Sequence, residues 1–342
     1  MKATHSVALI VTLLLVAGCG SSTPSSNSDD TSFRTGAQGL ELNLPATTPT
    51  KFIEGSGAEE MILEIHNRGA FPQSSEIGRL RASVWAGGYD QNLLTIKHKS
   101  SEISIDMLEI DGATDLVLEG RSVYNSEGGY KPFILEIDPI NVPDGVSRYS
   151  PTIKFATGFT YATTASVPIC YDPNPQSTRQ LEKPCKFTES ISLSDQGAPI
   201  AVTSIEQDVV GGNDGKVLYR IFLENKGSGK IVDPSIALET NPFKDGYRLS
   251  ELNNVFLAEF RVGAAEAKVC RPVIIKMIDG KGVSFCEFLK TEINPNHQAI
   301  ETPVTVVLRY GYTHIIEKKI NIEEGVSIAA GAGAGIPEDI LV

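Results

Sequence analysis

Apolar and polar residues alternate along many short stretches of the chain, and this alternation constrains the fold more than any other feature. A period of two places one face of a strand against a core and the other face in water. Clusters of Gly, Pro, Asn and Asp separate the stretches and mark turns. Clear examples are Met61, Leu63 and Ile65; Phe133, Leu135 and Ile137; Val217, Tyr219 and Ile221; and Val304, Val306 and Leu308. The sequence therefore predicts an all-β fold of antiparallel strands.

The alternating stretches occur in two copies. Residues 61–69 match residues 219–227, and both segments end in an Asn-basic-Gly turn, in which Asn and Gly tolerate positive φ. Further along, Glu136–Pro139 matches Glu292–Pro295, and Phe155–Thr160 matches Leu308–Thr313. Because the matches follow the same order, we expect two tandem β-sandwich domains, at 39–170 and 198–323.

The cysteines indicate an oxidising compartment. After Cys19 an even number remains, which in an exported chain is typical of disulfides, and three connectivities are possible. Local pairing closes the shortest loops and predicts Cys170–Cys185 and Cys270–Cys286. The alternative, a zinc site, lacks a C-x-x-C motif, and neither His297 nor His314 has ligand-like spacing to the cysteines.

The segment between the two predicted domains, 171–197, contains Pro173, Pro175 and Pro184 and begins beside the first disulfide. Proline restricts the backbone, and a disulfide closes the loop. We therefore expect a stiff, stapled linker that fixes the angle between the domains.

The N-terminus reads as an export signal. Lys2 precedes an apolar stretch, Val7–Val16, that is too short to span a bilayer. Val16-Ala17-Gly18-Cys19 resembles the lipobox of prokaryotic lipoproteins, which implies removal of residues 1–18 and lipid on the Cys19 sulfur. The alternative is an ordinary secretory signal with an accidental cysteine.

Two further segments flank the domains. Residues 19–38 are rich in Ser, Thr, Asn and Asp, which predicts a flexible tether. Residues 324–342 are rich in Ala and Gly and are expected to be disordered.

Tandem strand–Asn-x-Gly–strand units resemble immunoglobulin-like and CARDB-like adhesion domains. Gly87–Asp90, Cys170–Pro175 and Gln196–Val202 are similar to segments of uncharacterised archaeal surface lipoproteins with two such domains. The resemblance implies a lipid-anchored surface protein with two immunoglobulin-like β-sandwiches. It implies no catalytic residue, and the paired cysteine of the antibody fold is missing from both predicted sandwiches.

The sequence predicts no active site, no cofactor and no enzyme activity. The motifs G-x-S-x-G, H-E-x-x-H and G-x-x-x-x-G-K-[ST] do not occur. His66, His98, His297 and His314 are expected on the surface or half-buried on strands. A weak calcium site among the carboxylates of 106–115 is an alternative, although the segment lacks the spacing of a known calcium loop.

The candidate partner contacts are Trp85 and Tyr89. Trp85 is the only tryptophan, and it either packs in the core or forms an exposed aromatic platform with Tyr89. A net charge of −12 argues against nucleic acid as a partner, because phosphate contacts need clustered Lys and Arg. Exposed sheet edges offer a second route to a partner, because an edge can accept another strand.

These observations favour a structural or adhesive surface protein, held to the membrane by its lipid and presented to a protein or glycan partner. An accessory subunit of an envelope secretion or transport complex is the alternative from a second class, and a solute-binding protein or hydrolase is a third.

Overall fold

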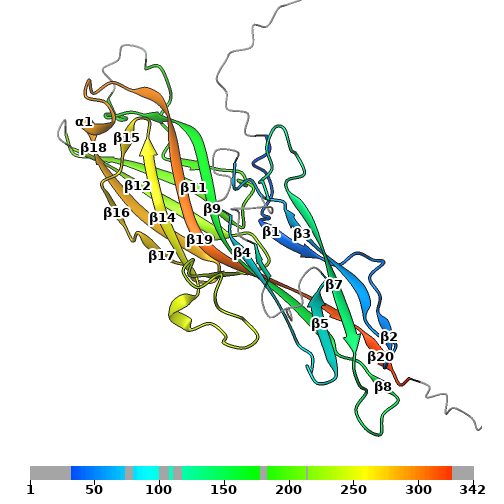
Figure 1. Ribbon diagram of the computed structural model, residues 1–342. Coiled ribbons are helices and arrows are strands. Elements are labelled where there is room, and N and C mark those ends of the chain that lie inside the picture. The colour runs from blue at the N-terminus through cyan, green and yellow to red at the C-terminus, as the bar shows by residue number, and fades with distance from the viewer. Residues whose placement is uncertain are drawn as a thin grey trace, which may run out of the picture. The chain divides into compact units, whose positions relative to one another are not determined.

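Figure 1 shows the computed structural model, which describes residues 32–73, 80–99, 108–110, 118–177, 183–212 and 215–325. Nearly all regular structure in these ranges is β-strand, and almost all strand pairs are antiparallel. The helical elements of the described ranges are the single turns η2 (Leu249–Glu251) and α1 (Lys290–Ile293). The prediction of an all-β, antiparallel fold is therefore confirmed.

Two groups of sheets, called lobe 1 and lobe 2 below, make up this part of the chain. Lobe 1 contains a four-stranded sheet in the order β1-β3-β7-β5. Its other side is β9-β4-β6, part of a larger eight-stranded sheet. The strands are β1 (Leu40–Asn43), β3 (Glu59–Asn67), β4 (Ala82–Gly87), β5 (Leu94–His98), β6 (Leu108–Ile110), β7 (Tyr130–Pro139) and β9 (Thr152–Tyr171).

Lobe 2 repeats this arrangement with a five-stranded sheet in the order β10-β11-β12-β18-β16. Its other side is β19-β14, with β15 and β17 both paired to β14. The strands are β10 (Ser190–Ser192), β11 (Ile200–Val210), β12 (Lys216–Asn225), β14 (Asn254–Val262), β15 (Ala265–Glu266), β16 (Val269–Arg271), β17 (Ile274–Lys276), β18 (Lys281–Leu289) and β19 (Ile300–Lys319).

The strand orders of the lobes correspond, apart from β10 and β15 of lobe 2, which have no counterpart in the described part of lobe 1. The sheet β1-β3-β7-β5 has the order of β11-β12-β18-β16, and β9-β4-β6 has the order of β19-β14-β17. The matching Asn-basic-Gly segments occupy equivalent places, because β3 ends at Asn67 and β12 ends at Asn225. This agreement is what a duplicated sequence predicts.

Strands β9 and β19 join the lobes. They pair along their whole length, from Thr152↔Lys319 to Tyr171↔Ile300, with Phe159 opposite Tyr312 near the middle. The first half of β9 also pairs with β4, and the first half of β19 also pairs with β14. The second half of each strand continues into the sheet of the other lobe, as the green and orange strands of Figure 1 show. Each lobe therefore contains strand from both copies of the repeat.

The end of the second copy also contributes to lobe 1. Strand β20 (Asn321–Glu323) pairs in parallel with β2 (Lys51–Ile53) and antiparallel with β8 (Arg148–Tyr149). In the middle of the long pair, β13 (Lys230–Val232) adds to β19 at 311–313. The sequence pattern did not predict this exchange. The predicted domain ranges and the stiffness of the 171–197 linker remain predictions, although β10 shows that part of this linker is strand.

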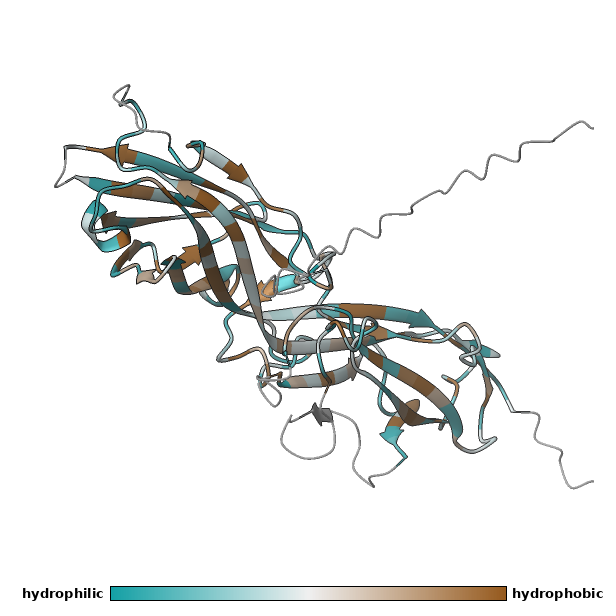
Figure 2. Cartoon of the chain, turned by 90° about the horizontal axis from the view of Figure 1, so that it is seen from above, coloured by the Kyte–Doolittle hydropathy of each residue, from teal (hydrophilic) through white to brown (hydrophobic). Residues whose placement is uncertain are grey.

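Alternation of burial follows the sequence pattern. On β12, Val217, Tyr219 and Ile221 are buried, whereas the residues between them are exposed. The same alternation appears on β3 and β7, and Figure 2 shows brown and teal alternating along many strands. The inward residues of both lobes belong to one continuous hydrophobic core. Burial of the apolar sides of the strands is thus the main stabilising contribution to this fold.

Both predicted disulfides are confirmed. Cys170, near the end of β9, is bonded to Cys185, and Cys270 on β16 is bonded to Cys286 on β18. The second bond joins directly paired residues of adjacent strands. Each bond closes a loop of 15 or 16 residues, so each is worth roughly 3 kcal/mol by the chain-entropy estimate.

Candidate functional site

Trp85 belongs to the core, and the hypothesis that it forms an exposed platform is wrong. The residue is 1% exposed on β4. A side chain at Gly158 would come within 2.8 Å of the Trp85 ring and would also overlap the carbonyl of Ala237. One residue beyond Ala86, a side chain at Gly87 would meet the ring of Phe243. The segment 233–245 of the second copy therefore covers β4, which explains why Trp85 does not face water.

Tyr89 follows β4 and is half-buried, packed against the edge of the core. It does not form a shared platform with Trp85, because Trp85 is covered. A contact between Tyr89 and a partner remains a prediction.

The histidines lie on separate elements, half-buried as expected. His66 is on β3, 3.8 Å from the Glu64 carboxylate, and its ring lies tilted against the ring of Tyr130, with the ring centres 4.4 Å apart. Burial lowers the pKa of His66, with Arg68 acting in the same direction and Glu64 opposing it. Within the described ranges, no group of three or more His, Cys, Asp or Glu side chains is arranged to hold a metal ion.

Several predicted sites lie outside the described residues. These are Cys19 with the signal and most of the tether, Asp106 and Asp115 of the alternative calcium site, and the tail beyond residue 325. In the ranges that the structure does describe, no helix is long and apolar enough to cross a membrane.

A polar contact at the end of β3 was not predicted and occurs twice. The Tyr161 hydroxyl donates to Asn67 Oδ1 at 3.2 Å and accepts from the Phe71 backbone N–H at 3.3 Å. Asn67 Nδ2 donates to the carbonyls of Phe71 and Leu118, at 2.7 and 3.0 Å. We call this group the lobe 1 clamp.

The lobe 2 clamp uses the matching asparagine. The Tyr312 hydroxyl donates to Asn225 Oδ1 at 3.0 Å and accepts from the Gly229 N–H at 2.8 Å, while Asn225 Nδ2 donates to the Gly229 carbonyl at 3.2 Å. The tyrosines come from the two exchanged strands. The sequence signal was the repeated Asn-x-Gly, which by itself predicts only a turn.

Two buried charges fix the far end of lobe 2. Lys290 is 2% exposed, and its Nζ donates to the carbonyls of Gly211 and Gly212 at 2.8 and 3.0 Å. Asp172, also 2% exposed, lies 2.5 Å from Lys183 Nζ. Burial lowers the pKa of Lys290, and Asp172 opposes this change. Both charges have protein partners, so their role here is structural.

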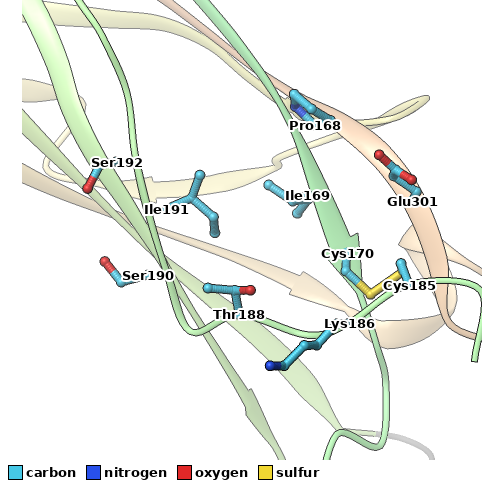
Figure 3. A pocket seen from close by; sticks show the side chains of 10 residues that line it. All are labelled: Pro168, Ile169, Cys170, Cys185, Lys186, Thr188, Ser190, Ile191, Ser192 and Glu301. Carbon is cyan, nitrogen blue, oxygen red and sulfur yellow. A yellow bond between two sulfur atoms is a disulfide. The ribbon is translucent and has the colours of Figure 1, made fainter.

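A groove lies between β10 and the second half of β9. It has a volume of about 500 Å³ and is open to solvent. Ile169 and Ile191 form its apolar part, and Figure 3 shows both side chains between the two strands, with the Cys170–Cys185 disulfide at one end. The remaining lining residues are Pro168, Lys186, Thr188, Ser190, Ser192 and Glu301.

Strand β10 is the edge of its sheet, and its described pairing is with β11 alone. An edge strand presents unpaired N–H and C=O groups on its outer side, which can bind an extended peptide. Hydroxyl groups and one charge of each sign surround the apolar centre of the groove. This combination suits a neutral, extended protein segment better than a strongly charged ligand. A second, shallower depression is polar and is lined by Ser147, Arg148, Glu323 and Glu324.

Comparison with known proteins gives no family. No family model matches the chain, and no curated protein matches it. Among solved structures, AggA, the major subunit of aggregative adherence fimbriae type I from Escherichia coli, is 10% identical, with a TM-score of 0.18, over 36% of this chain and 85% of that chain.

Two further solved structures cover more of the chain. The C-terminal domain of the Streptococcus agalactiae AgI/II polypeptide BspA is 9% identical, with a TM-score of 0.18, over 83% of this chain and 98% of that one. The Salmonella enterica SafA pilin in complex with the SafB chaperone is 11% identical, with a TM-score of 0.16, over 74% and 86%. Similarities this weak carry no argument, so the fold assignment rests on this chain's own strand pairing.

Proposed function

We propose that this chain is an exported surface protein, anchored by lipid on Cys19, with a structural or adhesive role. Its two lobes present loops and sheet edges to a protein or glycan partner. The role is one of binding and display, without a chemical reaction. Nucleic acid is not its partner, because the net charge of −12 disfavours phosphate contacts.

The disulfides are the observation that carries this proposal. Cys170–Cys185 and Cys270–Cys286 take up all four cysteines after Cys19. Structural disulfides persist in oxidising, extracytoplasmic compartments and are rare in the cytosol. Together with the signal-like residues 1–18, they support export, and they leave Cys19 as the thiol available for lipid.

The anchor is tested by expressing the full chain in a bacterial host and analysing its N-terminal peptide by mass spectrometry. We expect the peptide to begin at Cys19 and to carry the added mass of lipid. The Cys19→Ser variant should lack this mass and should leave the membrane fraction. An unmodified Cys19 in the wild-type chain, or retention of residues 1–18, would contradict the anchor.

The groove beside β10 is the contact surface that the geometry supports best. Photo-crosslinking on intact cells compares the wild type with Ser190→Trp, which fills the groove, and with Leu249→Trp, which changes a residue that is 86% exposed on η2. A crosslinked partner should appear with the wild type and Leu249→Trp and should be lost with Ser190→Trp. Equal crosslinking in all three would remove the groove as the contact surface.

A further inference from the structure

The loop before β7 presents two apolar side chains to solvent. Val123 is 54% exposed, and Tyr124 is 100% exposed. They are the central residues of a tight turn, in which the Ser122 N–H donates to the Asn125 carbonyl at 2.8 Å and the Asn125 N–H donates back to Ser122 at 3.2 Å. We call residues 122–125 the tip turn.

The tip turn is held by a network of hydrogen bonds. Its side chains are therefore exposed on an ordered turn and not on a loose loop. The Ser122 hydroxyl accepts from the Asn125 N–H at 3.1 Å, and Asn125 Oδ1 accepts from the Gly128 N–H at 3.0 Å. At the base of the loop, the Gly129 N–H donates to the Glu119 carbonyl at 2.7 Å. The loop therefore offers its two apolar residues in a fixed position, which lowers the entropy cost of a contact.

Valine and tyrosine are unusual at such a position. Gly, Pro, Asn, Asp and Ser dominate turns, because they suit the backbone or bond to it. Tyr124 gains nothing from packing within the folded chain, since it is fully exposed, and more than half of Val123 also faces water. Apolar residues at turn positions that usually hold small or polar residues, with little packing inside the folded chain, indicate a contact with a partner outside the chain.

The loop lies beside the place where the chain enters lobe 1. The Arg121 side chain bonds to the carbonyl of Thr35, and the Arg121 N–H donates to the Gly69 carbonyl at 2.6 Å. Figure 1 shows the loop before β7 next to the start of the described chain. Residues 20–31 connect Cys19 to Ser32. Even a fully extended chain of this length would separate Cys19 from Ser32 by no more than roughly 45 Å. A lipid on Cys19 therefore keeps this end of lobe 1 within reach of the membrane.

We propose that Val123 and Tyr124 rest on the surface of the membrane that holds the anchor. This inference depends on the proposed function, because it requires lipid on Cys19. Tyrosine combines an apolar ring with a polar hydroxyl and favours the boundary between acyl chains and headgroups. The contact adds a small apolar area to the binding provided by the lipid and fixes the orientation of lobe 1. Since neither residue is charged, zwitterionic lipid is sufficient.

The test uses the chain from Cys19 to Val342, coupled through Cys19 to a maleimide lipid. The other cysteines are in disulfides, so the coupling is specific. Vesicles contain phosphatidylcholine with brominated acyl chains, which quench tryptophan at short range. The variant is Tyr124→Trp, and the matched control is Leu249→Trp, an exposed position on lobe 2. Trp85 is buried and supplies the same background to both.

We expect the emission of the Tyr124→Trp variant to shift to shorter wavelength on vesicles and to be quenched by bromine, while Leu249→Trp keeps its emission in water. An unshifted and unquenched Tyr124→Trp would overturn the proposal and would leave a protein as the partner of the tip turn. Equal quenching of the two variants would also overturn it, because contact would then be unspecific. Chemical coupling makes the result independent of lipidation in cells, so failure of the anchor and failure of the tip turn are distinguishable.

Discussion

The two clamps use the same residue pair in different surroundings. In lobe 1, Asn67 is 0% exposed and bonds two carbonyls in addition to the Tyr161 hydroxyl. In lobe 2, Asn225 is half-buried and bonds one carbonyl in addition to the Tyr312 hydroxyl. The repeat supplies the two matching asparagines, but the tyrosines are not matching positions, because Tyr312 matches Phe159. The surroundings of each asparagine decide which tyrosine it meets and how much the contact contributes.

The lobes also differ in how they are reinforced. Cys270–Cys286 links adjacent strands of lobe 2, and Cys170–Cys185 joins the lobe 2 half of β9 to the segment before β10. Lobe 1, in its described part, depends on packing, β20 and the cover that segment 233–245 places over Trp85. Each lobe is thus supported by the other. The following variants test how far the two lobes differ in the stability that this support provides.

The largest effect is expected for Trp85→Ala. Removing this buried ring leaves a cavity between β4 and the segment 233–245, so the free energy of unfolding should fall by about 4 kcal/mol. Phe256→Ala is the matched control, because Phe256 lies on β14, the corresponding strand of lobe 2, and is 41% exposed. It should cost under about 1 kcal/mol. Urea unfolding measures both, and equal losses would contradict the cover over β4.

Next is the loss of one disulfide, in the double variant Cys270→Ser, Cys286→Ala. Freeing a 16-residue loop should cost about 3 kcal/mol. Hydrogen exchange should show faster opening of β16 and β18 than of β3 and β7, because the constraint lies in lobe 2. Equal acceleration in both lobes would mean that the shared strands couple them into one cooperative unit.

The clamps give the third comparison. Asn67→Ala leaves two buried carbonyls without a donor and should lower the free energy of unfolding by about 3 kcal/mol, whereas Asn225→Ala should lower it by about 1 kcal/mol. Asn43→Ala is a control for amide loss at an exposed position, where Nδ2 bonds Glu64 at 2.6 Å. Chemical unfolding ranks the three, and a larger loss for Asn225→Ala would reverse our comparison.

The smallest effect is a dependence on alkaline pH. Burial raises the pKa of Tyr312 to about 12, and burial also raises that of Tyr161. The unfolded chain releases these protons near pH 10, before the folded chain does. The stability they contribute is therefore complete below pH 10 and is lost as pH rises toward 12. Between pH 10 and 11, the wild-type chain should lose about 1 kcal/mol of stability through Tyr312, and the Tyr312→Phe variant should not show this loss. The free energy of unfolding of both chains, measured at each pH, gives the difference. An unchanged slope would contradict burial of the hydroxyl.

Much of the fold was predictable because it depends on local patterns. Period-two alternation marked the strands, as on β3 and β12, since a strand buries every second side chain wherever it is placed. The disulfide pairs followed from short loop lengths. The candidate surfaces were less predictable, because the groove between β9 and β10 joins residues near 168 and 190 with Glu301.

Trp85 illustrates the limit most clearly. Its sequence neighbourhood fits both a core strand and an exposed platform, and only the covering segment 233–245 separates the two. The tip turn was missed for the opposite reason. Val123 and Tyr124 are large hydrophobic residues, which a sequence pattern assigns to the interior. The turn that holds them nevertheless exposes them to water.

By itself, the sequence determined many of the strands, which face of each is apolar, where the repeat lies and which cysteine pairing closes the shortest loops. All of these depend on the backbone geometry of a few neighbouring residues. Only the tertiary structure decided that β9 and β19 extend into each other's lobe and that a loop from one copy covers the other. Segments far apart in the sequence have similar local patterns, so several pairings between them are possible. The free energy of the whole core selects among these pairings.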